Sequence, residues 1–215
     1  NKNINKQFLR ITPVDLKSFY WPKLSPSLSK YKRGRVLIVA GSEKYKGAAL
    51  LALRGALSSG VGSLNAALPM SMSDHIWQSI PEVVLNNSLN CCSSRSSKIC
   101  DCLKLIDLKS FDSLLIGPGI GVGEEGWEDF AYLLEDFPGL LVLDADALNR
   151  IALCRDGYQW FLRRKGKTCI TPQLNEFRRL FPSIDTSFLP HAALQASKLT
   201  GAFVLLKCAH SVISD

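Results

Sequence analysis

The residues best placed to do chemistry stand directly after apolar runs of the sequence. Asp144 and Asp146 follow the run LLVL, and the glycine-rich segment GPGIGVG (117–123) follows the run SLLI. Two carboxylates at i and i+2 can hold Mg²⁺ through water or hold a substrate hydroxyl, and glycines let a ligand approach the backbone closely. Both segments therefore predict a binding site, although Asp146 alone could be an ordinary helix N-cap.

Two further segments repeat this arrangement. GSEKYKGAA (41–49) follows the run RVLIVA and opens a helix at Gly47 and Ala48, whose amides suit an anion. TPQLNEF (171–177) follows TCI and places Glu176 near a helix start, where a carboxylate is also favoured for purely structural reasons. An ordinary strand-to-helix connection explains either segment alone. Four such strand ends meeting at one sheet edge predict a small-molecule cleft.

These strand ends share one edge only if the strands are parallel. From Gly34 onward, apolar runs alternate with helical patterns, and the runs are continuous, as expected for strands covered on both faces. The sequence therefore predicts an α/β fold with a mostly parallel central sheet and helices on both faces. Strands are expected at 34–41, 62–69, 113–116, 139–143, 167–172 and 202–207. Helices are expected at 47–60, 71–80, 98–107, 126–137, 147–153, 174–181 and 191–201, and a loop at 86–97.

The charge of the chain is concentrated at its start. The 215 residues carry a net charge of +7, of which residues 1–35 supply +8 and the remainder −1. The prolines and serines among these residues argue against regular structure, so we interpret 1–33 as a basic arm or linker. Basic residues are not interleaved with aromatics along a face, so nucleic acid is not expected as a partner. No apolar run approaches the ~20 residues of a membrane span.

The seven cysteines fit no zinc motif. Cys91 and Cys92 are adjacent, and Cys100 and Cys102 are separated by one residue. Free thiols in a reducing compartment are the simplest interpretation, which predicts a cytoplasmic protein. A metal site built from the 91–102 cluster is the alternative.

Six segments together resemble the NAD(P)H-hydrate dehydratase family: GRVLIVAGSEKYKGAALLALRGALSSGVG, PEVV, LLIGPGIG, LVLDADALN, ITPQLNEFRRLF and LLKCAHSVI. The resemblance runs from about Gly34 to the last residue, and implies a ribokinase-like domain over 34–215. It also implies the reaction. ADP or ATP, with Mg²⁺, phosphorylates the hydroxyl of hydrated NADH or NADPH, and elimination of phosphate restores the dihydronicotinamide.

The resemblance also implies two sets of site residues. Together with Asp144, those expected to bind the substrate are Gly47, Ala48, Gly119, Gln173, Asn175 and Glu176. Those expected in the loop that binds the nucleotide phosphates are Lys207, Cys208, Ala209, His210 and Ser211. Without the resemblance, Lys207 would be interpreted as a surface lysine at the end of a strand. Bacterial members usually carry His-Pro-Gly where this chain has Gln173, Leu174 and Asn175, and the family usually has a glycine where this chain has Cys208.

The resemblance places the general base, an aspartate in a glycine-rich anion hole, beyond Asp215. The chain alone is therefore expected to be inactive. Residues 1–33 are expected to link it to an epimerase domain, and the enzyme is expected to form a homo-oligomer. Two alternatives remain, a vitamin or sugar kinase of the same fold and a non-catalytic nucleotide-binding domain. Gln173, Cys208 and the missing end favour the second.

Overall fold

The computed structural model describes residues 8–19, 29–93, 95–123 and 125–215. Its strands form one nine-stranded sheet in the order β4-β3-β2-β1-β5-β6-β7-β8-β9. The strands are β1 (Arg35–Val39), β2 (Ser63–Pro69), β3 (Val84–Ser93), β4 (Ser96–Lys98), β5 (Ser113–Ile116), β6 (Leu140–Leu143), β7 (Thr168–Ile170), β8 (Phe203–Leu206) and β9 (Val212–Ser214). Only the two outermost pairs, β3 with β4 and β8 with β9, are antiparallel. The predicted mostly parallel sheet is confirmed.

Helices connect most of the strands. The α-helices are α1 (Pro13–Leu16), α2 (Lys46–Ser58), α3 (Met70–Ser73), α4 (Cys100–Lys104), α5 (Ala131–Glu135), α6 (Asp146–Leu153), α7 (Leu174–Leu180) and α8 (Leu189–Thr200). Short 3₁₀ turns are η2 (Lys30–Arg33), η3 (Ile76–Gln78), η4 (Leu108–Ser110) and η5 (Gly157–Arg163). The helix expected at 126–137 is shortened to α5, and the one expected at 71–80 is divided into α3 and η3.

The prediction of a loop at 86–97 is wrong, because this stretch contributes to β3 and β4. Parallel pairing with β2 uses backbone groups, so it tolerates the polar side chains of Asn87 and Ser88. The Ser88 hydroxyl also donates to the Ser73 hydroxyl at 3.3 Å. The resulting hairpin brings a segment predicted to be irregular up to the glycine-rich loop 117–123.

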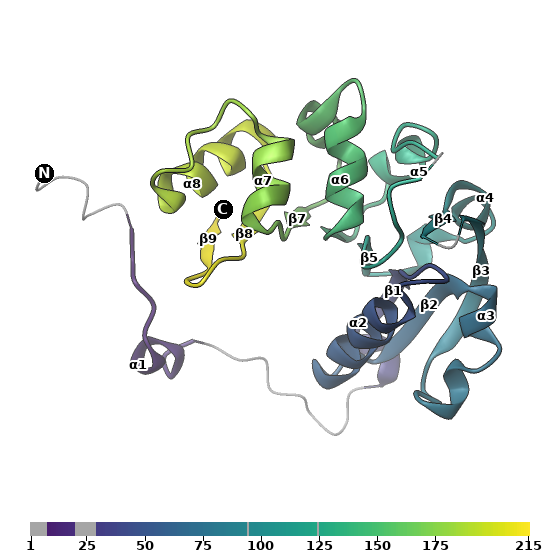
Figure 1. The fold of residues 1–215 in the computed structure, drawn as a ribbon. Helices are drawn as coiled ribbons and strands as arrows, with labels where there is room; N and C mark the ends of the chain where they lie inside the picture. The colour runs from purple at the N-terminus through teal and green to yellow at the C-terminus, as the bar shows by residue number, and fades with distance from the viewer. Residues whose placement is uncertain (1–7, 20–28, 94, 124) are drawn as a thin grey trace, which may run out of the picture.

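The two faces of β1 pack into two separate cores. Leu37 and Val39 belong to the larger core, which includes buried residues of α4 to α8. Ile38, between them, packs in a smaller core with Ala49 and Leu53 of α2. Successive strand residues point to opposite faces, so this alternation places helices on both sides of the sheet. Figure 1 shows α6, α7 and α8 on one side and α2 on the other.

The face of the sheet that carries Ile38 and packs against α2 is less well covered over β6 to β9. The register aligns Val142, Cys169 and Phe203 across β6, β7 and β8, and Leu205 with Ile213 across β8 and β9. Val142, Cys169 and Leu205 are half-buried, whereas Phe203 is 38% exposed and Ile213 is 70% exposed. Residues of β6, β7 and β8 on the opposite face, such as Leu143, Ile170 and Val204, belong to the larger core and are fully buried. The sheet therefore keeps a partly open apolar area on one side.

The leading segment is described only in part. Within it, α1 is a single turn and η2 is a 3₁₀ turn, while the predictions for 1–7 and 20–28 lie outside the described residues. None of the described helices is long and apolar enough to cross a membrane.

Candidate active site

The predicted site residues lie along one edge of the sheet. Strands β1, β5, β6, β7 and β8 are neighbours and run parallel, so their carboxyl ends form a row. The residues that follow these strands are Gly47 and Ala48 after β1, Gly119 after β5, Asp144 after β6, Gln173 after β7 and Lys207 after β8. The common edge agrees with the cleft that the strand ends predict.

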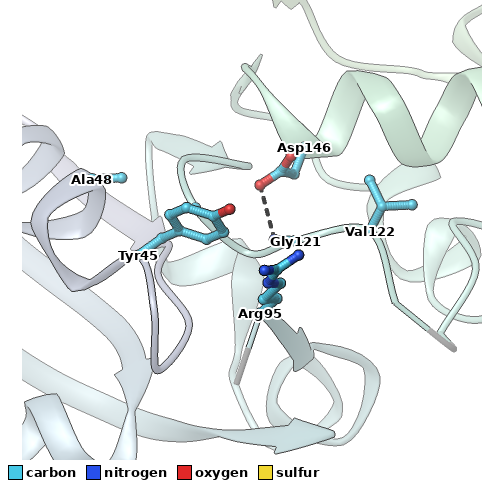
Figure 2. Close-up of a pocket in the computed structure, with 7 residues that line it drawn as sticks. Tyr45, Ala48, Arg95, Gly121, Val122 and Asp146 are labelled. Atoms are coloured by element: carbon cyan, nitrogen blue, oxygen red, sulfur yellow. Dashed lines mark hydrogen bonds between the residues drawn. The ribbon is translucent and has the colours of Figure 1, made fainter. Parts of the chain in front are cut away.

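A pocket of about 380 Å³ lies at the β1–β5 part of this edge. We call it the glycine pocket, and its lining residues are Tyr45, Ala48, Arg95, Gly119, Gly121, Val122 and Asp146. Figure 2 shows the side chains of Tyr45, Arg95, Val122 and Asp146 arranged around the backbone of Gly121. They come from the start of α2, the β3–β4 hairpin, the loop after β5 and the start of α6.

Glycine is required at two positions of the pocket. Gly119 has φ +71°, and a Cβ there would lie 2.9 Å from the carbonyl oxygen of Tyr45. Gly121 has φ +75°, and a Cβ there would lie 1.8 Å from the carbonyl oxygen of Arg95. Both backbone conformation and space therefore exclude a side chain. The absence of these side chains lets three segments meet around the pocket.

Asp146 holds the glycine loop in place. Its carboxylate accepts a hydrogen bond from the Gly121 amide at 2.9 Å and another from the Asn149 side chain at 3.3 Å. The interpretation of Asp146 as the N-cap is wrong, because Ala145 occupies that position with φ +50°. The turn thus frees the Asp146 carboxylate to reach across to the loop.

A buried ion pair supports the floor of the pocket from below. Arg150 of α6 is 2% exposed and lies 3.1 Å from the carboxylate of Glu125. Its guanidinium also donates to the carbonyl of Gly121 at 2.8 Å and to that of Ser97 at 2.7 Å. Glu125 in turn accepts the Ile99 amide at 2.6 Å. This network ties the glycine loop to the β3–β4 hairpin and α4 from inside the protein.

Lys207 lies further along the edge and is engaged in an ion pair. Its ammonium is 2.5 Å from the carboxylate of Asp144, with side-chain exposures of 35% and 27%. Its amide donates to the carbonyl of Pro172 at 2.8 Å, and an isolated parallel bridge pairs it with Gln173. The predicted phosphate-binding cation therefore has a carboxylate partner. Asp144 and Asp146 consequently have different partners.

The remainder of the predicted nucleotide loop, residues 208–211, connects β8 to β9. Cys208 is half-buried and packs against the larger core, whereas Ala209, His210 and Ser211 are exposed. We call residues 207–211 the lysine turn. Its last three side chains are available to a ligand, and its first residue is fixed by Pro172 and Asp144.

The segment after β7 is a helix start. The carboxylate of Glu176 accepts the Gln173 amide at 2.7 Å, so the structural explanation for Glu176 holds. Asn175 is exposed, and its carbonyl accepts from the Arg179 side chain at 3.1 Å. Gly47 is exposed in the first turn of α2 and does not line the glycine pocket. Ala48 and Gly119, two other predicted substrate-binding residues, do line it.

Sequence reasoning did not identify four residues of the glycine pocket. Tyr45 and Gly121 lie inside GSEKYKGAA and GPGIGVG, two segments predicted to form the site, but nothing in the sequence distinguishes them from their neighbours. Val122 has no chemical signal of its own. Arg95 lies in the stretch predicted to be a loop, and only the pairing of β3 with β4 brings it to the edge.

No metal cluster is formed by the described residues: no three His, Cys, Asp or Glu side chains converge. The cysteines described as free thiols are Cys91, Cys100, Cys102, Cys154, Cys169 and Cys208. Burial raises the pKa of Cys102 to about 12, so this thiol stays protonated. The predicted free thiols agree with these cysteines, and the alternative metal site at 91–102 is not found among them.

Comparisons with known proteins agree with this geometry. The family model described as NAD(P)H-hydrate dehydratase matches residues 36–215. Bifunctional NAD(P)H-hydrate repair enzymes of Gloeobacter violaceus and Synechocystis are 37% and 34% identical, and each match covers 86% of this chain. The chain spans about a third of these relatives' length, 35% and 34%.

Solved structures show the same fold. The ADP/ATP-dependent NAD(P)H-hydrate dehydratase of Bacillus subtilis, co-crystallized with ATP/Mg²⁺, superimposes with a TM-score of 0.72 at 22% identity, covering 94% of this chain and 68% of that one. A ribokinase-like superfamily protein of Enterococcus faecalis gives 0.67 at 17% identity, covering 89% and 63%. The ribokinase-like fold is confirmed, and the chain belongs to the NAD(P)H-hydrate dehydratase family.

Proposed function

We propose that this chain supplies the larger part of the catalytic domain of an ADP- or ATP-dependent dehydratase, which restores NADH and NADPH from their hydrated forms. The observation that carries the proposal is the family match, which includes every predicted site residue between 36 and 215. The relatives are named as NAD(P)H-hydrate repair enzymes, which suggests the substrate class. The B. subtilis neighbour's name and its ATP/Mg²⁺ ligands suggest the phosphoryl donor.

In this proposal the glycine pocket takes the hydrated dinucleotide. Its rigid loop and the helix start at Ala48 lie at the carboxyl edge of the sheet, where such folds bind small molecules. Phosphoryl transfer depends mainly on positioning and charge stabilisation, and a preformed pocket supplies the positioning. Gly47, Gln173 and Asn175, at the same edge, are proposed to complete the substrate contacts.

The lysine turn is proposed to hold the nucleotide phosphates. Lys207 supplies a cation, and the exposed residues 209–211 supply backbone amides and a hydroxyl. Mg²⁺ would neutralise phosphate charge, and Asp144, a half-exposed carboxylate beside Lys207, is the residue here that fits its preference for oxygen. Because no three acidic side chains converge among the described residues, most of its other ligands would be phosphate oxygens and water.

The substrate hydroxyl must lose its proton to attack the donor phosphate, which requires a base. The carboxylates at this edge are each engaged, since Asp146 holds Gly121, Asp144 pairs with Lys207 and Glu176 caps α7. We therefore propose that the base lies on polypeptide that follows Asp215, and that the 215 residues alone turn over poorly. The partly open face of β6 to β9 offers such a segment an apolar surface.

The test is an assay of hydrated NADH with ADP or ATP, following the return of dihydronicotinamide absorbance and the release of phosphate. It is run on the chain alone and on the chain extended by the sequence that its gene encodes after Asp215. We expect restoration of NADH by the extended protein and little by the short one. A stable phosphorylated product would indicate a small-molecule kinase, and nucleotide binding with no product a non-catalytic domain.

The leading segment suggests an additional domain. The relatives are named bifunctional, and this chain covers about a third of their length. We propose that residues 1–33 link the dehydratase domain to an epimerase domain. Homo-oligomer formation stays a prediction, which sedimentation of the purified protein would test.

A further inference from the structure

Arg95 stands out among the residues of the glycine pocket because its backbone is fixed while its side chain is not. Its carbonyl packs against Gly121, leaving no room for a Cβ. Two residues later, the Ser97 amide donates to the carbonyl of Ile120 at 2.8 Å and the Ser97 carbonyl accepts from Arg150 at 2.7 Å. The hairpin therefore delivers the Cα of Arg95 to a defined place at the rim.

The guanidinium of Arg95 carries a charge that the described residues do not neutralise. The side chain is exposed, and no ion pair joins it to a carboxylate in the described ranges 8–19, 29–93, 95–123 and 125–215. By contrast, Arg150 and Arg163 both pair with carboxylates. Figure 2 shows Arg95 and Asp146 bordering the same pocket. A cation without an internal partner, held at a pocket rim, suits an anionic ligand.

Arginine suits an oxyanion such as phosphate, because its planar fork of donors can form two parallel hydrogen bonds to two oxygens of the group. The Asp146 carboxylate accepts hydrogen bonds from the Gly121 amide and the Asn149 side chain. A carboxylate has about four acceptor positions, so it can also accept a hydrogen bond from a ligand hydroxyl. A ligand with a phosphate near a sugar hydroxyl would satisfy both residues. Phosphorylated ribose has this chemistry.

We infer that Arg95 binds a phosphate of the hydrated dinucleotide and thereby sets substrate affinity, an inference that rests on the proposed function. Two phosphates of the substrate share this chemistry. The pyrophosphate is present in both hydrated NADH and hydrated NADPH, whereas the 2′-phosphate is present only in hydrated NADPH. The phosphates of ATP belong, in this account, to the lysine turn.

The experiment measures equilibrium binding of hydrated NADH, hydrated NADPH and ATP, each titrated by calorimetry into wild-type protein and Arg95→Ala, Arg95→Lys and Arg155→Ala. Arg155 is an exposed arginine two residues beyond the end of α6 and serves as the matched control. Because the Arg95 side chain is exposed, its removal should leave the thermal midpoint unchanged, and this is checked in parallel.

We expect Arg95→Ala to weaken dinucleotide binding by roughly 10- to 100-fold, as for a lost charge-assisted hydrogen bond. Arg95→Lys should recover part of the loss, and the difference between Arg95→Ala and wild type should shrink at high salt. Equal losses for both dinucleotides identify the pyrophosphate, and a loss confined to hydrated NADPH identifies the 2′-phosphate. In the protein extended beyond Asp215, Arg95→Ala should raise the KM for the hydrated dinucleotide and leave kcat unchanged.

Three results would overturn the inference. If Arg95→Ala binds both dinucleotides as tightly as the wild-type protein does, Arg95 contacts neither of them. A loss of ATP affinity without a loss of dinucleotide affinity would assign Arg95 to the nucleotide. If the wild-type protein binds neither dinucleotide, the proposed function itself fails, and the role of Arg95 fails with it.

Discussion

The glycine pocket and the lysine turn lie on the same sheet edge but are held in different ways. The pocket floor rests on Arg150, a buried arginine that bonds to Gly121 and pairs with Glu125. The lysine turn is fixed by one half-exposed ion pair, Lys207 to Asp144, and one backbone hydrogen bond to Pro172. The pocket thus has its shape before any ligand arrives, whereas the turn has contacts that a ligand can replace.

This difference suggests how the two sites divide the work. A substrate that must be positioned for phosphoryl transfer benefits from a rigid site, since ordering is then complete before binding. A nucleotide phosphate approaching Lys207 competes with Asp144 for the same ammonium. Exchange of one half-exposed partner for another has a small net free energy. The turn can therefore adjust to its ligand while the pocket stays fixed.

The largest expected effect is on the network below the pocket. Arg150→Ala removes one partner of a buried pair and leaves the Gly121 and Ser97 carbonyls without their donor. We expect the free energy of unfolding, measured by urea denaturation, to fall by ~3–5 kcal/mol. Arg155→Ala, on an exposed arginine of the same chain, should change it by less than ~0.5 kcal/mol. Equal, small losses would show that the network does not support the pocket.

Substitutions at two glycines distinguish a glycine that the backbone conformation requires from one that a bound ligand requires. Gly121→Ala puts a methyl into the Arg95 carbonyl at a positive φ, and should lower the free energy of unfolding by ~2–4 kcal/mol. Gly47→Ala meets nothing within 4 Å and lies in a helix, so stability should rise by ~0.5–1 kcal/mol. Urea denaturation checks both.

Substrate titration of Gly47→Ala adds an independent test of that residue. If the dinucleotide approaches the Gly47 backbone, its affinity should fall although the protein is more stable. Unchanged affinity would remove Gly47 from the substrate site and leave Ala48 as the contact from α2.

At the lysine turn we expect binding to change more than stability. Lys207→Ala should lower the free energy of unfolding by only ~1 kcal/mol, because the pair is half-exposed, while weakening ATP binding about tenfold. In the absence of Mg²⁺, Asp144→Asn should keep ATP affinity or raise it, since the Lys207 ammonium is released from its ion pair. Lys198→Ala, an exposed lysine on α8, is the control. A larger stability loss with unchanged ATP binding would make Lys207 a structural residue.

The smallest expected effect concerns the turn between the two regions. Ala145 is the non-glycine residue with positive φ among the described residues, and such a conformation is strained. Ala145→Gly should therefore raise the free energy of unfolding by ~0.5–1 kcal/mol, measured by urea denaturation. Ala152→Gly, inside α6, should lower it by ~1 kcal/mol. If both substitutions destabilise equally, the turn is not strained.

The sequence was sufficient for the elements whose patterns are local. The apolar runs and glycine stops predicted β1, β2, β5, β6, β7 and β8, together with α2 and α8, and the strand ends predicted the shared edge. The pairing of Lys207 with Asp144 was not predictable, because the two residues are 63 positions apart and meet only through the strand order. Likewise, β3 has polar side chains, so its strand character and the placement of Arg95 came from pairing with β2 and β4.

The most direct test of the division into two sites is a map of amide shifts by nuclear magnetic resonance. The 215-residue chain is titrated separately with hydrated NADPH and with a non-hydrolysable ATP analogue. We predict that hydrated NADPH shifts amides of residues 45–48, 95–97 and 119–122, and that the ATP analogue shifts those of residues 207–211. Shifts by hydrated NADPH at 207–211 alone, or by the ATP analogue at 119–122 alone, would contradict the account.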